Sequence, residues 1–486
     1  MKKNKTNGLL TDLYQITMAY GYWKLGLDRQ RAVFHSFFRR QPFRGGYSVF
    51  SGLWPFVDFT RNFGFTEQDL DYLSKLTGSD EKPLFEDEFL ACLAQMEFSC
   101  DIDAVAEGTV VFPHEPLVRI SGPLIQCQIL ETPLLNFTNF QSLIATKAAR
   151  ICSVAGNDPV LEFGLRRAHG MDGALSASRA AYVGGCAATS NVLAGKLYNI
   201  PVRGTIAHSW VMAFDDELSA FRAYAKTLPN NSILLVDTYD TLEGVRRSIT
   251  VGKELAAKGH VFSGIRIDSG DLCALAKQAR SLLDESGFKK TKIVASNDLD
   301  EYRIRDLKKN NTPIDIWGVG TRLVTAYDHP ALDGVYKLTA LDRKDGTRKQ
   351  VLKLSEQPEK TTIPGIQQIR RFRRQGKYLG DMIYDTDTGV NGRELCLLSG
   401  TRKKEMLPPD ADYCDLLVPV VRSGKAVGPS PALKVIRKKL NEELRALDSG
   451  IFALANPLVY PVGLEKTLWQ KRQEHIAGLK KNGKTG

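Results

Sequence analysis

The chain has 486 residues, is 43% hydrophobic and 25% charged, and carries a formal net charge of +11, so we expect two or more domains in a globular protein. Its basic residues form no stripe interleaved with aromatic side chains, and the charge therefore favours a polyanionic small substrate over nucleic acid. Eight irregularly spaced cysteines, the lack of a signal-like N-terminal segment and the lack of an 18-residue apolar run predict a cytoplasmic protein with no membrane partner.

The first predicted element is a helix over residues 11–26. Thr11 is its expected N-cap, and Lys24 followed by Gly26 is typical of a helix end. Tyr14 and Met18 share a face of this helix that is separate from the predicted core face. The side chains expected to face the core are Leu13, Ile16, Tyr20 and Trp23.

Strands are predicted next. Residues 31–53 alternate well enough for a strand pair with a turn at Gly45–Gly46, and residues 103–137 read as further strands. We take residues 1–150 as the N-terminal part of a β-rich flanking domain.

The central part, residues 151–335, behaves differently. Short apolar runs alternate with helical segments at spacings of about 20–40 residues, as in βα units. Because these runs are continuously apolar, they predict strands buried on both faces of a parallel sheet. Six units in succession favour an α/β barrel, although the pattern leaves a doubly wound sheet open. The runs are 159–164, 200–205, 232–237, 263–268, 291–296 and 314–320.

From residue 336 to residue 486 the pattern returns to strands, with a helix predicted over 431–450. We assign this segment to the C-terminal part of the flanking domain together with a helical tail.

Polar residues and glycines stand at the end of each central run or just beyond it, where a barrel enzyme carries its chemistry. Arginines suit phosphate or carboxylate oxygens, glycines expose backbone N–H groups to anions, and aspartates suit Mg²⁺ or ribose hydroxyls. The residues are Arg166, Arg167, His169, Gly204, Thr205, His208, Ser209, Asp237, Thr238, Asp240, Arg266, Asp268, Ser269, Gly270, Asp271, Asn297, Asp298, Gly318, Gly320 and Thr321.

Each of these signals also has a structural explanation when taken alone. The glycines in 318–321 can simply turn the chain, Arg266 and Asp268 can form a local ion pair, and His208 can be a hydrogen-bonded structural residue. Their recurrence after six successive runs favours function. The remaining histidines lack this setting and are predicted to be structural or solvated: His35, His114, His260, His329 and His475.

Several long motifs resemble the nicotinate phosphoribosyltransferase family. They are TDLYQITMAYGYW, EFGLRRAHGMDGALSASRAAYVGG followed by IPVRGTIAHSWV, LLVDTYDT, GIRIDSGDL, ASNDLDE, GVGT and LKLSEQPEKTTIPG, and they extend over nearly the whole chain. One departure is His169, where the family pattern has Gln.

The resemblance implies an α/β fold, the incomplete (β/α) barrel of the type II phosphoribosyltransferases with a flanking β-rich α+β domain. It implies synthesis of nicotinate mononucleotide and pyrophosphate from nicotinate and 5-phosphoribosyl 1-diphosphate, which feeds NAD synthesis. It also implies Mg²⁺ as cofactor, ATP as co-substrate through a phosphohistidine, and a homodimer with the active site at the interface.

The resemblance also implies roles for individual residues. Tyr14 is similar to the aromatic residue that stacks on the pyridine ring across the dimer interface. Thr205 and Arg266 resemble the groups that fix nicotinate, and His208 the histidine that ATP phosphorylates. The rest of the expected substrate site is Arg166 near the phosphoribosyl group, Gly320 and Thr321 at the ribose phosphate, and Ser269, Gly270 and Asp271, with Asp268 added to the catalytic set.

Two other functions stay open. The ring substrate could be nicotinamide or quinolinate, although an arginine at position 266 suits a carboxylate. A non-catalytic barrel that binds a phosphate ligand or RNA would also suit the positive charge. No residue is assigned as a metal ligand, because Asp268 and Asp271 are candidates by residue type only.

Overall fold

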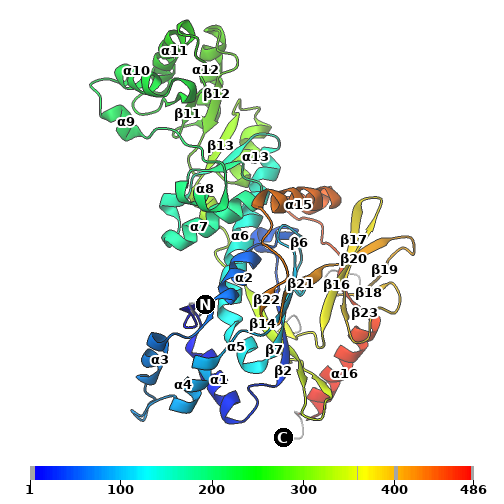
Figure 1. Ribbon diagram of the computed structural model, residues 1–486. Coiled ribbons are helices and arrows are strands. Elements are labelled where there is room, and N and C mark those ends of the chain that lie inside the picture. Colours follow the sequence, from blue (N-terminus) through cyan, green and yellow to red (C-terminus); the bar gives the residue numbers. More distant parts are fainter. Residues whose placement is uncertain (1–5, 358–359, 399–402, 483–486) are drawn as a thin grey trace. The chain divides into compact units, whose positions relative to one another are not determined.

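The computed structural model describes residues 6–357, 360–398 and 403–482. The chain divides into two compact units, one formed by Met1–Leu143 with Ala331–Gly486 and the other by Ile144–Pro330 (Figure 1). Helix α6 (Glu131–Ala155) carries the chain from the first unit into the second.

The Ile144–Pro330 unit is built on a six-stranded sheet in which every neighbouring pair is parallel. Its strands are short and most of their residues are buried, as expected for a sheet covered on both faces. In sheet order they are β10 (Ile233–Leu235), β11 (Gly264–Ile267), β12 (Lys292–Ala295), β13 (Ile316–Val319), β8 (Val160–Glu162) and β9 (Ala188–Thr189).

Helices follow these strands, as the sequence predicts for βα units. Helices α11 and α12 both contact β11, and α10 packs on α11. The helices are α7 (Gly170–Val183), α8 (Val192–Tyr198), α9 (His208–Met212), α10 (Glu217–Thr227), α11 (Thr241–Ala257), α12 (Leu272–Glu285), α13 (Glu301–Lys309) and α14 (Thr321–Val324).

Five of the six predicted central runs are strands, and the run 200–205 is not. Pro201 in this run has no N–H to give to a sheet ladder. Only Val202 forms a bridge, to Thr189 of the two-residue strand β9, which takes the edge position instead. The segment that leads to His208 therefore lies outside the regular sheet.

The other unit holds two large sheets. The seven-stranded sheet is antiparallel throughout, and the six-stranded sheet is antiparallel except where β17 pairs with β23. The first has the order β15 (Arg348–Gln350), β14 (Gly334–Asp342), β2 (Arg31–Phe38), β7 (Val118–Pro123), β5 (Asp101–Val105), β21 (Leu417–Arg422) and β22 (Lys425–Ala426). The second has the order β19 (Lys404–Met406), β18 (Glu394–Leu397), β23 (Val462–Glu465), β17 (Lys377–Asp385), β16 (Gln367–Arg374) and β20 (Asp412–Asp415).

Two small sheets and seven further helices complete the described part of this unit. The small sheets pair β1 (Thr6–Asn7) with β4 (Phe63–Gly64) and β3 (Ser48–Val49) with β6 (Val110–Val111). The helices are α1 (Leu13–Lys24), α2 (Leu53–Arg61), α3 (Glu67–Ser74), α4 (Asp87–Gln95), α5 (Leu124–Ile129), α15 (Leu433–Ala446) and α16 (Lys466–Asn482). The predicted combination of a parallel α/β sheet with β-rich flanking material is confirmed.

The first helix begins one residue later than predicted. Asp12 is the N-cap, and its backbone N–H donates to Oε1 of Gln15 at 2.7 Å. The Thr11 hydroxyl bonds to the Gln15 side chain and to the carbonyl of Ile129 instead. Leu13, expected in the core, is 55% exposed. It shares this exposure with Tyr14, which is 48% exposed, so the helix presents a wider apolar surface than its spacing predicts.

Two strand predictions near the N-terminus are wrong. Residues 31–53 do not form a strand pair, because β2 pairs with β7 and β14 while β3 pairs with β6. The strands predicted over 103–137 stop at Pro123, and α5 and α6 follow. Local alternation reveals a strand, but it does not reveal a partner that lies far along the chain.

An ion cluster is buried where β16, β17 and α15 meet. Arg371 donates to both carboxylate oxygens of Asp381 and, through Nη1 at 2.9 Å, to Glu443. The Tyr460 hydroxyl donates to Asp381 at 2.9 Å. Burial and the neighbouring Asp381 carboxylate raise the pKa of Glu115, which faces Arg371, well above its usual value. Arg371 is therefore the buried cation shared by Asp381 and Glu443, and Lys439 adds a second cation to Glu443 at 3.1 Å.

His35 on β2 is fully buried, as its structural assignment predicts. Its Nδ1 lies 2.9 Å from the Thr339 hydroxyl, and its Nε2 accepts the Gln367 N–H at 3.2 Å. Burial, together with the positive charge of Arg119, lowers its pKa well below 6.5. The imidazole therefore stays neutral in the folded protein.

The neutral His35 predicts acid sensitivity. Because its pKa is lower in the folded than in the unfolded chain, its contribution to stability is complete above about pH 6.5 and is lost as the pH falls below that value. Each pH unit costs about 1.4 kcal/mol until the folded-state pKa is reached. We expect urea unfolding between pH 7 and pH 5 to show this loss in the native protein and not in His35→Gln. The surface variant His260→Gln should keep the native pH dependence.

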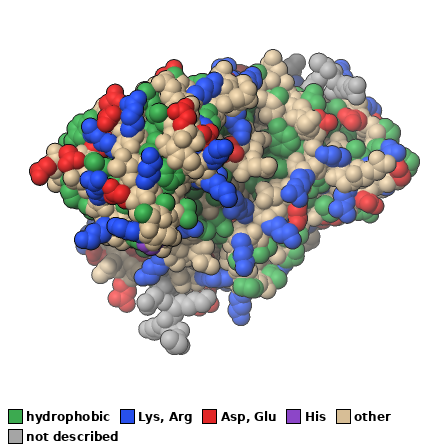
Figure 2. All heavy atoms as spheres, turned by 90° about the horizontal axis from the view of Figure 1, so that it is seen from above, with side chains coloured by type: hydrophobic (Ala, Val, Ile, Leu, Met, Phe, Trp, Pro, Cys, Tyr) green, Lys and Arg blue, Asp and Glu red, His purple; other side chains and the backbone are tan. Residues whose placement is uncertain are grey.

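No helix in the described part of the chain is both long and apolar enough to cross a membrane. On the face drawn in Figure 2, lysine and arginine side chains are spread among acidic and uncharged ones.

Candidate active site

A pocket of about 290 Å³ opens where the carboxyl ends of the parallel strands meet their following loops. It brings together five of the residues to which the resemblance assigns a role, Arg166, Thr205, His208, Arg266 and Asp268, together with the candidate Gly204. The described lining is Phe163, Leu165, Arg166, Ser190, Gly204, Thr205, Ile206, Ala207, His208, Leu235, Arg266 and Asp268.

Arg266 on β11 connects the walls of this pocket. Its Nε donates to the Ser296 hydroxyl at 2.9 Å, and its Nη1 donates to the Thr205 hydroxyl at 3.0 Å. Its Nη2 lies 3.1 Å from a carboxylate oxygen of Asp268. The guanidinium carbon also lies 5.8 Å from the centre of the Phe163 ring. Arg266 is thus a largely buried cation fixed in one orientation beside an aromatic face.

Asp268 is held on two sides. The Ser296 hydroxyl donates to its Oδ1, and its own backbone N–H donates to Asp237 at 2.9 Å. Asp237 also accepts the Ser269 hydroxyl at 2.6 Å. The second oxygen of Asp237, Oδ1, is buried without a hydrogen-bond partner among the described residues. Oδ2 of Asp237 therefore orders the turn after β11, while Oδ1 of the same carboxylate accepts no hydrogen bond from the described residues.

His208 is the first residue of α9, and its side chain is 41% exposed. Its Nδ1 lies 3.1 Å from the Thr238 hydroxyl, and its Nε2 lies 4.0 Å from Oδ2 of Asp268. The ring is therefore positioned by Thr238 on one nitrogen, while the other nitrogen faces the pocket's carboxylate.

Arg166 lies in a short helical turn, Leu165–Arg167, directly after β8. Glu162 anchors the start of this turn. Its buried carboxylate accepts the Gly164 N–H, the Ser178 hydroxyl at 2.8 Å and the Thr189 hydroxyl. A single carboxylate thus joins β8, α7 and β9 beneath the exposed Arg166.

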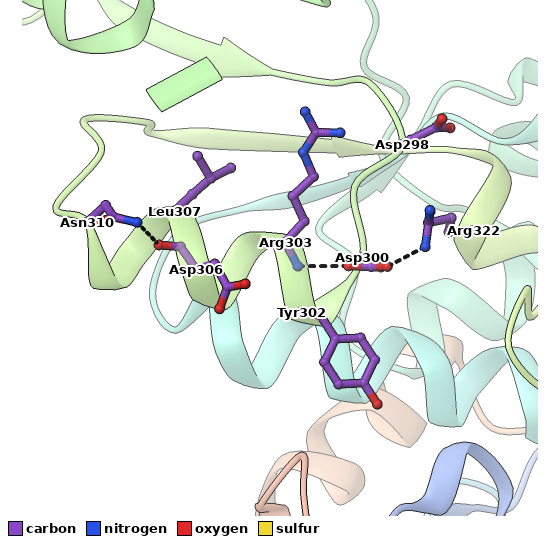
Figure 3. A pocket seen from close by; sticks show the side chains of 8 residues that line it. All are labelled: Asp298, Asp300, Tyr302, Arg303, Asp306, Leu307, Asn310 and Arg322. Carbon is purple, nitrogen blue, oxygen red and sulfur yellow. Dashed lines mark hydrogen bonds and ion pairs between the residues drawn. The ribbon is translucent and has the colours of Figure 1, made fainter. Parts of the chain in front are cut away.

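A second pocket of about 390 Å³ lies beside the turn after β13 (Figure 3). In it, Nη1 of Arg322 lies 2.8 Å from Asp300, which also caps α13 through the Arg303 N–H. The chain reaches Asp300 through Asn297 and Asp298, both with positive φ. The ion pair thus fixes the loop after β12 to the start of α14. The other lining residues are Tyr302, Asp306, Leu307 and Asn310.

The remaining predicted site residues lie outside the first pocket's lining. Gly320 is the N-cap of α14, and a Cβ there would lie 3.2 Å from the Phe163 carbonyl. Thr321 begins the same helix. Gly270 has a φ of +74°, and Asp271 uses its carboxylate to cap α12 through the N–H groups of residues 273 and 274.

Tyr14 belongs to the other unit. Burial, followed by the carboxylates of Glu131 and Asp12, raises its pKa to about 12, so the hydroxyl stays protonated. Gln15 donates to that hydroxyl at 2.9 Å.

Two residues beside Arg266, Phe163 and Ser296, are not among the predicted site residues. Phe163 directly follows β8, and an apolar residue inside the predicted run 159–164 gives no polar signal at a strand end. Ser296 ends the run 291–296 and was counted as part of the strand. Its hydroxyl joins Arg266 to Asp268, which a serine at a strand end could have suggested.

The described residues include no group of three or more His, Cys, Asp or Glu side chains arranged to hold a metal ion. A magnesium ion that used one or two carboxylates and otherwise substrate oxygens would fit this arrangement, with Asp268 the carboxylate of the lining.

The chain matches the family models of the nicotinate phosphoribosyltransferase (NAPRTase) N-terminal domain over residues 9–139, the NAPRTase family over 159–388 and the C-terminal domain over 367–472. Nicotinate phosphoribosyltransferase of Bacillus subtilis is 42% identical, with 98% of this chain and 97% of that protein covered. The human protein of that name is 34% identical, with 95% of each covered. A crystal structure of human nicotinic acid phosphoribosyltransferase covers 96% of this chain and 99% of its own, with 30% identity and a TM-score of 0.83.

Proposed function

The chain belongs to the nicotinate phosphoribosyltransferase family and is an enzyme of that activity, and we propose how its pocket performs the reaction. The observation that carries the proposal is the fixed guanidinium of Arg266 beside Thr205 and the Phe163 ring. An aromatic face and a buried cation together suit a flat ring that bears a carboxylate.

Nicotinate lies in this proposal against Phe163. Its carboxylate accepts from Arg266 and from the Thr205 hydroxyl, which already bond to each other in the structure. Nicotinamide would offer Arg266 and Thr205 a neutral amide in place of a carboxylate, and the loss of this charge-assisted bond would make the site selective.

5-Phosphoribosyl 1-diphosphate is the second substrate, with Arg166 near its phosphoribosyl group and Gly320 and Thr321 at the ribose phosphate. The exposed Arg166 side chain and the backbone of the turn before α14 supply donors for these oxygens. A bound magnesium ion would neutralise part of the charge of the pyrophosphate that leaves. Asp268 would be its protein ligand. Ser269, Gly270 and Asp271 would shape the turn that holds Asp268.

The bond-forming step needs no general base. The pyridine nitrogen of nicotinate is a nucleophile at neutral pH, and it attacks the ribose C1 as the bond to pyrophosphate breaks. What the protein contributes is the position of the two substrates and donors for the departing charge. The described pocket residues supply both without a catalytic triad.

ATP coupling passes in this proposal through His208. One imidazole nitrogen attacks the γ-phosphorus of ATP, ADP leaves, and phosphohistidine forms. Thr238 holds the other nitrogen, which leaves the nitrogen toward Asp268 for the attack. The added negative charge then reorganises the segment that leads into α9, and hydrolysis restores it.

Nicotinate mononucleotide formation from nicotinate and 5-phosphoribosyl 1-diphosphate, with Mg²⁺ and with or without ATP, tests these assignments. We expect product to rise with ATP and acid-labile phosphate to appear on the native protein and not on His208→Ala. Equal ATP stimulation in His208→Ala would exclude the phosphohistidine. Product formed with nicotinamide and not with nicotinate would refute the role of Arg266.

The homodimer is proposed from two exposed apolar surfaces, one on each unit. Exposed apolar groups of this kind are typical of protein interfaces. One surface comprises Leu10, Leu13, Tyr14 and Met18, and the other comprises Met171, Val192, Leu193 and Leu197. Packing one on the other between two copies would deliver Tyr14 of one copy to the pocket of its partner.

A shared site predicts complementation between two inactive variants. The Tyr14→Ala copy keeps an intact Arg266 pocket, and the Arg266→Met copy keeps an intact Tyr14. In a mixed dimer, the tyrosine of the second copy therefore completes the pocket of the first, which gives one complete site of two. Refolding the two together should restore about a quarter of the native activity by random pairing. Mixing either variant with itself is the control, and absence of any restored activity would contradict a shared site.

We also propose that the six parallel strands are the incomplete barrel of the type II phosphoribosyltransferases. The unbroken order from β10 to β9 and the pocket at the strand ends support it. Cytoplasmic location is proposed because all eight cysteines are free thiols.

Gly318 on β13 sets the position of the Phe163 ring. A Cβ at residue 318 would lie 2.8 Å from Cδ2 and 2.9 Å from Cε2 of that ring. Gly318→Ala should therefore displace the ring and lower kcat/KM for nicotinate by roughly 10- to 100-fold, as misplacement by about 1 Å does. Gly173→Ala on α7 is the control, because a Cβ at residue 173 would meet no atom within 4 Å, and this variant should keep native kinetics.

A further inference from the structure

A pocket of about 740 Å³ lies in the β-rich unit, between the C-terminal helix α16 and the segment that follows β15. Its walls come from one face of the helix and from a short stretch of loop. The lining residues are Leu354, Ser355, Glu356, Thr361, Arg472, Gln473, Ile476 and Lys480.

Arg472 is the distinctive residue of this pocket. Its Nε donates to the carbonyl of Thr362 at 3.1 Å, and its Nη2 donates to the carbonyl of Thr361 at 2.9 Å. These bonds use two of the five N–H donors of the guanidinium. Within the described chain no carboxylate forms an ion pair with it. Burial lowers its pKa, with no compensating charge. Among the described residues, this largely buried cation thus has no anion as its partner.

The rest of the lining suits an anion with an organic body. Lys480 adds a second cation, and Ser355 and Thr361 add hydroxyls. Glu356 is the carboxylate of the described lining, so the cations exceed the anions. Leu354 and Ile476 supply apolar surface beside these groups.

We propose that this pocket binds a small molecule of about mononucleotide size whose phosphate or carboxylate group accepts from Arg472. A guanidinium offers paired donors that match the oxygens of such groups, and charge-assisted bonds of this kind are stronger than neutral ones. The volume lies within the range of small-molecule sites. The proposal is independent of the reaction at the parallel sheet.

A purely structural role for Arg472, as a clamp on residues 361 and 362, accounts for its two bonds. It accounts neither for the pocket beside the guanidinium nor for the lack of a carboxylate. A clamp through two neutral carbonyls would be served by donors that cost less to bury than a full positive charge.

Calorimetric titration of the full-length protein with AMP, citrate and inorganic phosphate tests the proposal. Four proteins are compared: native, Arg472→Met, Ile476→Trp and Lys471→Met. Ile476→Trp fills the pocket and keeps the arginine, so it decides the question if Arg472→Met fails to fold. Lys471→Met removes a cation from the same helix outside the lining. The catalytic pocket contributes equally in all four.

We expect AMP or citrate to bind at one site in the native protein and in Lys471→Met. In Arg472→Met and Ile476→Trp, binding at this site should be lost or at least tenfold weaker. Loss with AMP alone identifies a phosphate ester, and loss with citrate alone identifies a carboxylate. Identical isotherms in all four proteins would overturn the proposal. Binding of inorganic phosphate without either organic anion would overturn the assigned size.

Discussion

Replacing Arg266 with methionine is expected to lower kcat/KM for nicotinate roughly 30- to 5000-fold. The range corresponds to about 2–5 kcal/mol, the cost of removing one partner of a buried, hydrogen-bonded charge pair. Without the guanidinium, the substrate carboxylate loses its cation, and Asp268 and Thr205 lose their shared neighbour. Steady-state kinetics with purified protein measures the change.

Two comparisons make this result specific. Arg246→Met removes an exposed arginine on α11 that pairs only at the surface with Glu243, and it should leave kcat/KM within twofold of native. Nicotinamide as substrate tests the carboxylate directly, because Arg266→Met should reduce the preference for nicotinate as well as the rate. An unchanged preference would mean that Arg266 does not contact the carboxylate.

Replacing Arg371 with methionine should destabilise the β-rich unit by about 3–5 kcal/mol, as removal of one member of a buried ion pair does. The change leaves Asp381 buried without a cation, whereas Glu443 keeps its ion pair with Lys439 at 3.1 Å. Burying carboxylates without compensation costs far more than the lost packing of one side chain. Urea unfolding followed by tryptophan fluorescence measures the difference.

The same strand offers a matched control. Arg374 lies three residues from Arg371 and pairs with Asp410 at the surface, at 3.1 Å. Arg374→Met should cost no more than about 1 kcal/mol. Adding Asp381→Asn to Arg371→Met should restore part of the stability, because it removes the charge left without a cation. Equal stability of Arg371→Met and the native protein would show that the buried charges do not depend on this cation.

Much of the central unit is predictable because its signals are local. Strands β10 to β13 are mostly apolar, and polar residues at or just after their ends, Arg266 and Asp268 among them, fall into one pocket by the geometry of a parallel sheet. Strand β9 was missed because two residues carry no periodicity. The apolar run 200–205 predicts a strand, but Pro201 within it has no N–H to donate to a neighbouring strand, and only Val202 forms a bridge.

Long-range pairing explains the other failures. Strand β2 lies between β7 and β14, whose sequences are far from it and from each other, so no local pattern could name its partners. Ser296 illustrates the same limit in the site. Its position is predictable from the strand, but its bonds to Arg266 and Asp268 depend on how neighbouring strands are aligned. The role that we propose for Tyr14 requires a second copy of the chain, which one sequence does not describe.

The pocket is built from two kinds of chain, the strands of the sheet and the segment that leads into α9. Arg266 stands on a central strand, whereas Thr205 and His208 arrive on chain that is joined to the sheet by one bridge. We expect substrate binding to order this segment further, at a cost of up to about 1–2 kcal/mol of backbone entropy per residue. Affinity would then be lower than the contacts alone provide and product would leave faster, so this half of the pocket would favour turnover over tight binding.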